Sequence, residues 1–248
     1  MIAAILTIGN ELVSGDVPNT NGSFLARRLE ALGVRVTLIA ALPDEIEAIA
    51  TWIRREGPLV DHLLVTGGLG GTPDDLTREA LAATFGVEQK EVPEVAADLR
   101  ARFSGDPEYA ARWALLPAGS RPLANPLGGA PGFAIGNVFV LPGLPSEMEA
   151  MFDLVAHELA DTAPIACWRA TYRTTESRIV GVLEEAVARH PQVLVGSYPS
   201  FHASGALVEL VLKSPDAAAV EAARAFVEDA LRATPRAGGS VEPTPPSG

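Results

Sequence analysis

Short apolar runs and segments with helical spacing of apolar residues alternate along the first two thirds of the chain. The apolar runs are long enough for buried strands, and each ends at a glycine or proline; they lie at residues 2–8, 34–42, 63–66 and 137–141. The segments with apolar residues three and four positions apart follow them, at 24–32, 46–53, 76–85 and from 147 onward. This order predicts an α/β fold with an open, mostly parallel sheet.

The loop after the third run is rich in glycine and ends in two adjacent carboxylates. Its glycines are Gly67, Gly68, Gly70 and Gly71. Glycine lets a backbone approach a ligand closely and turn its N–H groups toward anionic oxygens. Asp74 and Asp75 follow where a metal ion or a polarised water would be needed. The alternative is a plain glycine turn in which one of these aspartates caps the next helix.

Polar residues also follow the other three apolar runs. Glu11, Asn19 and Asn21 come after the first run and Asp44 after the second, where it could also cap a helix starting at Glu45. After the last run, Ser146 is predicted to cap a helix that starts at Glu147. Because parallel strands present their carboxyl ends at one edge of a sheet, we expect the four loops to meet in one ligand-binding crevice.

These segments resemble the competence/damage-inducible protein A family. The motifs that carry the resemblance are Gly-Asn-Glu-Leu at 9–12, Asn-Thr-Asn at 19–21, Pro-Asp at 43–44, Thr-Gly-Gly-Leu-Gly at 66–70, Asp-Asp-Leu-Thr at 74–77, Asn-Pro-x-Gly-x-Ala-Pro-Gly-Phe at 125–133 and Pro-Gly-Leu-Pro-Ser-Glu at 142–147. They occur in the family's order over residues 2–231. The resemblance implies a three-layer α/β domain of the molybdopterin-binding type. It also implies metal-dependent hydrolysis of the phosphoanhydride of ADP-ribose-like or FAD-like dinucleotides.

The resemblance assigns roles to individual side chains. Glu11, Asp44 and Asp75 match acidic positions used catalytically in related domains. Related adenylyltransferases tend to carry a basic residue where this chain has Asp74. A second carboxylate there favours metal recruitment and therefore hydrolysis. We expect Asp44, Asp74 and Asp75 to bind a divalent metal, Mg²⁺, Mn²⁺ or Co²⁺.

The predicted substrate-binding residues come from all the loops except the one after the second run. They are Asn19, Asn21, Thr66, Gly67, Gly68, Gly70, Thr72, Gly143, Pro145 and Ser146. The main functional hypothesis is a nucleotide pyrophosphatase. The alternative is a molybdopterin-binding or molybdopterin adenylyltransferase-like protein of molybdenum cofactor biosynthesis, or a binding module without activity. Family members often continue into a nicotinamide mononucleotide deamidase domain, which we do not expect here, because only a short Pro/Gly/Ser-rich tail follows residue 231.

The composition of the chain limits the kinds of partner that it is expected to bind. The net charge of −12 argues against nucleic-acid binding, because no basic face is available to displace counterions. A single cysteine excludes internal disulfides, and the four histidines are scattered along the chain. No basic and apolar leader is recognisable at the start of the chain, so we expect a cytoplasmic protein without a membrane partner. The resembled proteins form dimers and trimers, and we favour a homodimer.

The pattern changes near residue 163. We therefore predict a nucleotide-binding domain at 1–162, a small α+β domain at 163–233 and a disordered tail at 234–248. The second domain has a predicted β-α-β-β-α order, which in the resembled family is a KH-like accessory domain. It lacks a Gly-x-x-Gly clamp and a basic stripe, so a role in packing or assembly is more plausible than RNA binding. Within the first domain, 87–116 is predicted as connecting helices.

Overall fold

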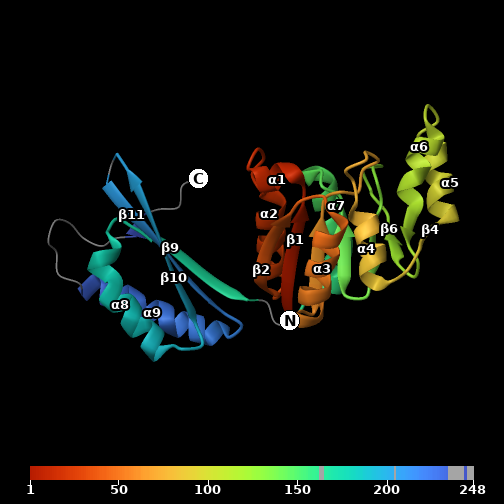
Figure 1. Ribbon diagram of the computed structural model, residues 1–248. Helices are drawn as coiled ribbons and strands as arrows, with labels where there is room; N and C mark the ends of the chain where they lie inside the picture. The colour runs from red at the N-terminus through yellow and green to blue at the C-terminus, as the bar shows by residue number, and fades with distance from the viewer. Residues whose placement is uncertain (162–164, 204, 234–242, 245–248) are drawn as a thin grey trace. The chain divides into compact units, whose positions relative to one another are not determined.

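The computed structural model describes residues 1–161, 165–203, 205–233 and 243–244. The chain forms two compact units, Met1–Thr162 and Ala163–Gly248, which are described separately below (Figure 1). No helix among the described residues has both the length and the apolar composition needed to cross a bilayer.

The first unit contains a six-stranded sheet in the order β2-β1-β3-β8-β7-β6. The strands are β1 (Ile2–Ile8), β2 (Arg35–Leu42), β3 (His62–Thr66), β6 (Arg121–Leu123), β7 (Gly132–Ile135) and β8 (Val138–Leu141). Strand β1 pairs in parallel with β2 and β3, and β3 pairs in parallel with β8. At the other edge, β7 pairs antiparallel with both β8 and β6. The predicted α/β fold with a mostly parallel sheet is confirmed.

Helices cover both faces of this sheet. The helices are α1 (Asn10–Ser14), α2 (Thr20–Ala31), α3 (Ile46–Glu56), α4 (Thr77–Phe85), α5 (Pro93–Arg102), α6 (Pro107–Ala111) and α7 (Pro145–Leu159), with 3₁₀ turns at Gly57–Leu59 and Arg112–Ala114. One apolar cluster joins α3 and α4 to the sheet, and a second joins α2 and α7 to the opposite face. Alternate residues of β1 serve the two clusters, which is why the whole strand is apolar.

Several elements differ from the sequence expectation. Helix α7 begins at Pro145, and no side chain caps it, so the prediction that Ser146 caps the helix is wrong: Ser146 is its second residue. Helix α2 begins at Thr20, earlier than predicted, because the Asn19 side chain accepts the N–H of Gly22 at 2.9 Å and caps it. The region predicted as helices alone also contains β4 (Gln89–Glu91) and β5 (Leu115–Pro117), which pair antiparallel. Three-residue strands are too short to show a period of two.

The second unit is an antiparallel sheet with two helices. Its elements are β9 (Ala166–Tyr172), α8 (Glu176–Arg189), β10 (Leu194–His202), β11 (Gly205–Ser214) and α9 (Ala217–Ala233), with strand order β10-β11-β9-β12. Tyr172, Ile179 and Val227 belong to the core that joins the sheet to both helices. Strand β12 (Pro243–Thr244) pairs with β9. The rest of the predicted disordered tail lies outside the described residues.

Candidate functional site

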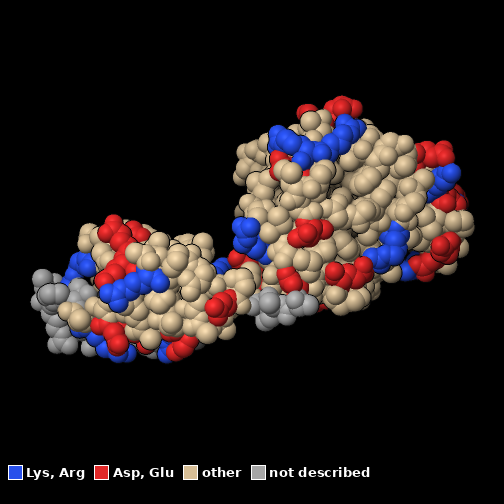
Figure 2. All heavy atoms as spheres, turned by 90° about the horizontal axis from the view of Figure 1, so that it is seen from below, with Lys and Arg blue, Asp and Glu red and all other residues tan. Residues whose placement is uncertain are grey.

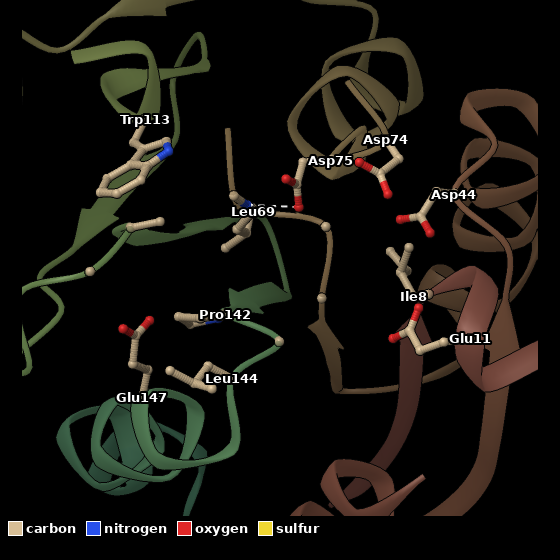
Figure 3. A pocket seen from close by; sticks show the side chains of 17 residues that line it. Ile8, Glu11, Asp44, Leu69, Asp74, Asp75, Trp113, Pro142, Leu144 and Glu147 are labelled. Carbon is tan, nitrogen blue, oxygen red and sulfur yellow. Dashed lines mark hydrogen bonds between the residues drawn. The ribbon is translucent and has the colours of Figure 1, made fainter. Parts of the chain in front are cut away.

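A cavity of about 420 Å³ opens where β1, β2, β3 and β8 end (Figure 3). Five carboxylates line it, namely Glu11, Asp44, Asp74, Asp75 and Glu147. No lysine, arginine or histidine is among its lining residues. The loops from all four strand ends therefore meet in one crevice, and the crevice is strongly acidic.

Helix α4 holds the carbonyl groups of the glycine loop. Thr77 donates its Oγ1–H to the carbonyl of Gly67 at 2.8 Å and its N–H to that of Gly68 at 3.2 Å. Arg78 donates from Nη1 to the carbonyl of Leu69 and from Nη2 to that of Gly70, both at 2.7 Å. Four successive carbonyl oxygens are thus bound by the first two residues of one helix.

Three N–H groups of this loop are unpaired within the described part of the chain. Among the described residues, no acceptor binds the N–H of Gly68, Leu69 or Gly71. Gly67 and Gly68 have φ of 107° and 63°, which favour glycine, and a Cβ on Gly67 would collide with the carbonyl of Ile8. A loop with bound carbonyls and unpaired amides is suited to anionic oxygens.

Arg78 is a buried cation behind the loop, with 5% of its surface exposed. Burial lowers the pKa of Arg78, whereas the carboxylates of Glu79 and Asp75 raise it. The guanidinium group of an arginine remains protonated in a protein even when it is buried. The loop therefore has a fixed positive charge behind it, although no cation lines the cavity.

Asp75 organises the loop as well as lining the cavity. Its Oδ1 accepts the N–H of Gly70 at 2.9 Å, and its Oδ2 accepts the N–H of Thr72 at 2.8 Å and the Thr72 hydroxyl. The alternative in which Asp74 or Asp75 caps α4 is wrong, because Leu76 is the N-cap residue and no side chain caps the helix. Replacing Asp75 by asparagine would change the loop's hydrogen bonds together with its charge.

Asp44 lies at the acidic end of the cavity. Its Oδ2 accepts the N–H of Asn10 at 2.9 Å, and it does not cap α3. The pKa of Asp44 is raised, first by burial and then by repulsion from Glu11, Asp74 and Asp75, against the opposing effect of the Asn10 hydrogen bond. The pKa of the exposed Asp74 is lowered, chiefly by the neighbouring Thr72. Three neighbouring carboxylates therefore disfavour the charged form of Asp44.

The predicted metal ligands are not assembled into a complete site. No group of three or more His, Cys, Asp or Glu side chains within the described part of the chain is placed to hold a metal ion. Asp44, Asp74 and Asp75 nevertheless line the same cavity. This donor set fits Mg²⁺, which is often bound by one or two carboxylates together with substrate phosphates and water.

A smaller cavity of about 110 Å³ adjoins the first, and Ile8, Glu11, Gly67 and Gly143 line both. The predicted ligand residues that line the smaller cavity are Asn19, Asn21, Thr66, Gly67, Gly143 and Pro145. Two of them also connect loops: Asn19 donates to Thr7 Oγ1 at 2.8 Å, and Asn21 donates to the carbonyl of Gly143 at 2.8 Å. The Asn21 Oδ1 is buried and has no hydrogen-bond partner. Thr72 and Ser146 line neither cavity.

Three residues of the site, Trp113, Glu147 and Arg78, do not follow from the sequence patterns. Trp113 comes from a 3₁₀ turn inside the region predicted as connecting helices, and apolar spacing alone indicated a core residue there. Glu147 is the last residue of the Pro-Gly-Leu-Pro-Ser-Glu motif, whose pattern predicts only that a helix starts there. Arg78 acts from behind the loop, which no local pattern reveals.

Removing the charge of Asp44 is expected to stabilise the ligand-free protein. A raised pKa means that the folded state binds the proton more tightly than the unfolded state, so ionised Asp44 destabilises the fold above its pKa. Because water screens this partly exposed group, we expect Asp44→Asn to raise the melting temperature at pH 7.5 in chelator by about 2–4 °C. The difference should shrink as pH falls through the pKa of Asp44.

Asp106→Asn is the control: Asp106 also precedes a helix without capping it by its side chain, but it is exposed, whereas Asp44 is partly buried. Calorimetry of the three proteins across pH would measure the effect. A melting temperature of Asp44→Asn at or below that of the wild type at pH 7.5 would contradict the proposed repulsion.

The comparisons with known proteins identify the first unit. Residues 4–161 match the family described as a probable molybdopterin binding domain. The chain is 40% identical to a CinA-like protein from Citrifermentans bemidjiense over 80% of this chain and 48% of that protein. It is 37% identical to a protein from Archaeoglobus fulgidus, over 79% of this chain and 84% of that one. The crystal structure of the protein CinA from Thermoplasma acidophilum superposes with a TM-score of 0.61 at 30% identity, covering 65% of this chain and all of that one.

The chain belongs to the CinA-type molybdopterin-binding family. The resemblance indicated by the sequence motifs is thereby confirmed. Residues 169–235, in the second unit, match the middle domain of FAD synthase. This chain spans about half the length of the CinA-like relative from Citrifermentans bemidjiense.

The charged surface provides no broad basic face in the view of Figure 2. On this face, lysine and arginine side chains form small groups separated by acidic and uncharged residues. This distribution agrees with the net charge of −12.

Proposed function

We propose that the crevice binds a phosphorylated pterin or a pterin nucleotide, as a molybdopterin-binding or molybdopterin adenylyltransferase-like protein of cofactor biosynthesis. The observation that carries this proposal is the glycine loop, whose carbonyls are bound by α4 and whose amides at 68, 69 and 71 have no acceptor among the described residues. Those amides and the charge of Arg78 would hold phosphate oxygens. The family match supports the pterin as the heterocycle.

A divalent cation is part of this proposal. Phosphate groups would otherwise meet Glu11, Asp44, Asp74 and Asp75 without an intervening positive charge. Mg²⁺, Mn²⁺ or Co²⁺ bound by Asp44 and one of the neighbouring aspartates would neutralise charge on the phosphoryl oxygens. Asp75 would keep the loop in position, and Glu11 would lie where the two cavities join.

A metal-dependent pyrophosphatase acting on ADP-ribose-like or FAD-like dinucleotides is the second candidate function. The observation that favours it is Asp74, a carboxylate that lines the cavity beside the glycine loop. A nucleotide polyphosphate would need a metal ion to bind next to this charge. Hydrolysis requires charge neutralisation and a positioned water, which carboxylates and a metal supply together.

One panel distinguishes the two functions. The purified protein would be incubated with ADP-ribose, FAD, and a pterin phosphate plus ATP, each in chelator and in Mg²⁺, Mn²⁺ or Co²⁺. Chromatographic release of AMP from ADP-ribose or FAD alone supports the pyrophosphatase. Metal-dependent binding of the pterin phosphate, with or without adenylyl transfer from ATP, supports the first proposal. No metal-dependent binding of any phosphate ligand would overturn both.

A homodimeric state and a cytoplasmic location belong to the same proposal. Analytical ultracentrifugation with and without ligand would decide the oligomeric state.

A further inference from the structure

The main cavity has two chemically different ends. In Figure 3, Asp44, Asp74 and Glu11 lie toward one end, and Trp113 and Glu147 toward the other, with Leu69 of the glycine loop between them. Pro142 and Leu144 lie beside Glu147 in this view. The first end suits a metal and phosphates. The second end combines a flat apolar surface with one carboxylate, which phosphate binding does not require.

Trp113 is the aromatic residue of the cavity lining. Its ring meets Phe103 edge to face at 5.2 Å and 85°, and Tyr109 at 5.9 Å and 70°. Two such contacts hold the indole in one orientation before any ligand arrives. Its Nε1 is buried without a hydrogen-bond partner in the structure, so packing alone fixes the ring. Trp113 is therefore a preformed platform for a planar ring.

Glu147 is held in place with one oxygen left over. Asn125, which is 4% exposed, donates its Nδ2–H to Glu147 Oε2 at 2.9 Å and to the carbonyl of Ala130 at 3.0 Å. Within the described part of the chain, no donor binds Glu147 Oε1. A side chain at Gly129 would collide with this carboxylate, so glycine at 129 keeps the space around it open. The free oxygen can accept hydrogen bonds from a ligand.

We propose that Trp113 and Glu147 form a ring-binding subsite that selects the 2-amino-4-oxopyrimidine edge shared by guanine and pterins and rejects adenine. The adjacent ring N–H and 2-amino group of this edge are both donors, which a carboxylate accepts. The corresponding edge of adenine presents an acceptor nitrogen that faces the carboxylate unfavourably. The inference rests on the proposed function, because it requires phosphates in the same crevice.

The test uses four ligands with the same triphosphate group. These are GTP, dihydroneopterin triphosphate, ATP and inorganic tripolyphosphate, each titrated into the full chain in Mg²⁺ by calorimetry. Charge-assisted hydrogen bonds to the selected edge should make GTP and dihydroneopterin triphosphate bind about tenfold or more tightly than ATP. The ratio between the first two distinguishes a guanine nucleotide from a pterin as the source of the ring.

Two substitutions separate the ring subsite from the phosphate site. Glu147→Gln keeps an acceptor for Asn125 but loses the charge, so the preference for GTP over ATP should fall to about threefold or less. Trp113→Leu should weaken GTP and dihydroneopterin triphosphate by about tenfold through lost stacking. Neither change should alter tripolyphosphate binding by more than about twofold. Glu149→Gln, an exposed carboxylate on the same helix α7, is the matched control and should leave every ratio unchanged.

The possible results test the ring subsite and the proposed function separately. Equal affinity for GTP and ATP in the wild type, with tripolyphosphate bound, overturns the ring subsite and leaves the phosphate site standing. A preference for GTP that survives Glu147→Gln also overturns it. If none of the four ligands binds in Mg²⁺, the proposed function itself fails.

Discussion

Gly68→Ala is expected to weaken Mg²⁺-dependent triphosphate binding by about 100-fold. A Cβ at this position would collide with Thr77 Oγ1 and would lie 3.3 Å from Asp44 Oδ1. The loop would have to move away from α4, which breaks the bonds from Thr77 to the carbonyls of Gly67 and Gly68. Two hydrogen bonds at about 1–1.5 kcal/mol each correspond to roughly that loss of affinity if the bound loop must restore them.

Gly86→Ala is the control for backbone strain. Gly68 and Gly86 have nearly the same φ, 63° and 66°, but a Cβ on Gly86 has no atom within 4 Å. Both variants should therefore lose similar conformational free energy, about 1 kcal/mol, while only Gly68→Ala loses affinity. Calorimetric titration with tripolyphosphate would measure this difference. Unchanged affinity in Gly68→Ala would place the phosphates elsewhere.

Arg78→Met is expected to lower the stability of the first unit by about 3 kcal/mol, or about 6–12 °C in melting temperature. The substitution keeps much of the apolar stem but leaves the carbonyls of Leu69 and Gly70 without donors. Each unpaired buried carbonyl costs about 1–3 kcal/mol, and relief of the buried charge offsets part of that cost. Arg78→Lys should recover only part of the loss, since a single ammonium lacks the fork that reaches both carbonyls.

Arg54→Met provides the comparison, because the exposed Arg54 donates to one carbonyl, that of Ala83 at 2.8 Å. It should cost less than about 1 kcal/mol. Scanning calorimetry would rank the four proteins. A melting temperature for Arg78→Met within 2 °C of that of Arg54→Met would show that the loop does not depend on the guanidinium.

The sequence predicted the parallel strands β1, β3 and β8 well because they are buried on both faces, whereas β2, also predicted as a buried strand, is a largely exposed edge strand. Strand β1 was bounded correctly, since a fully apolar run between polar segments has one physical interpretation. Strands β6 and β7 were missed because each has only three or four residues, and their pairing depends on a hairpin rather than on a periodic pattern.

From the sequence, only those site residues that directly follow a predicted strand could be located. The positions of Asp44 and Asp75 followed from parallel topology, whereas the use of both Asp75 oxygens by Gly70 and Thr72 depends on loop geometry that no spacing rule contains. Glu147 lines the crevice from the first turn of α7, which begins at Pro145. Contacts between distant segments, such as Asn125 with Glu147, require the fold itself.

The parts of the crevice come from separate segments of the chain. The glycine loop belongs to the β3–α4 connection, whereas Trp113 and Gly129 lie in the stretch between α4 and β7. Substitutions in that stretch can therefore change how a heterocycle binds while the affinity for the phosphate groups stays constant. The carboxylate of Glu147 belongs to a third segment, helix α7, so a chimera carrying residues 87–131 of a relative should inherit the donor's stacking surface, while this chain's Glu147 and phosphate affinity are kept.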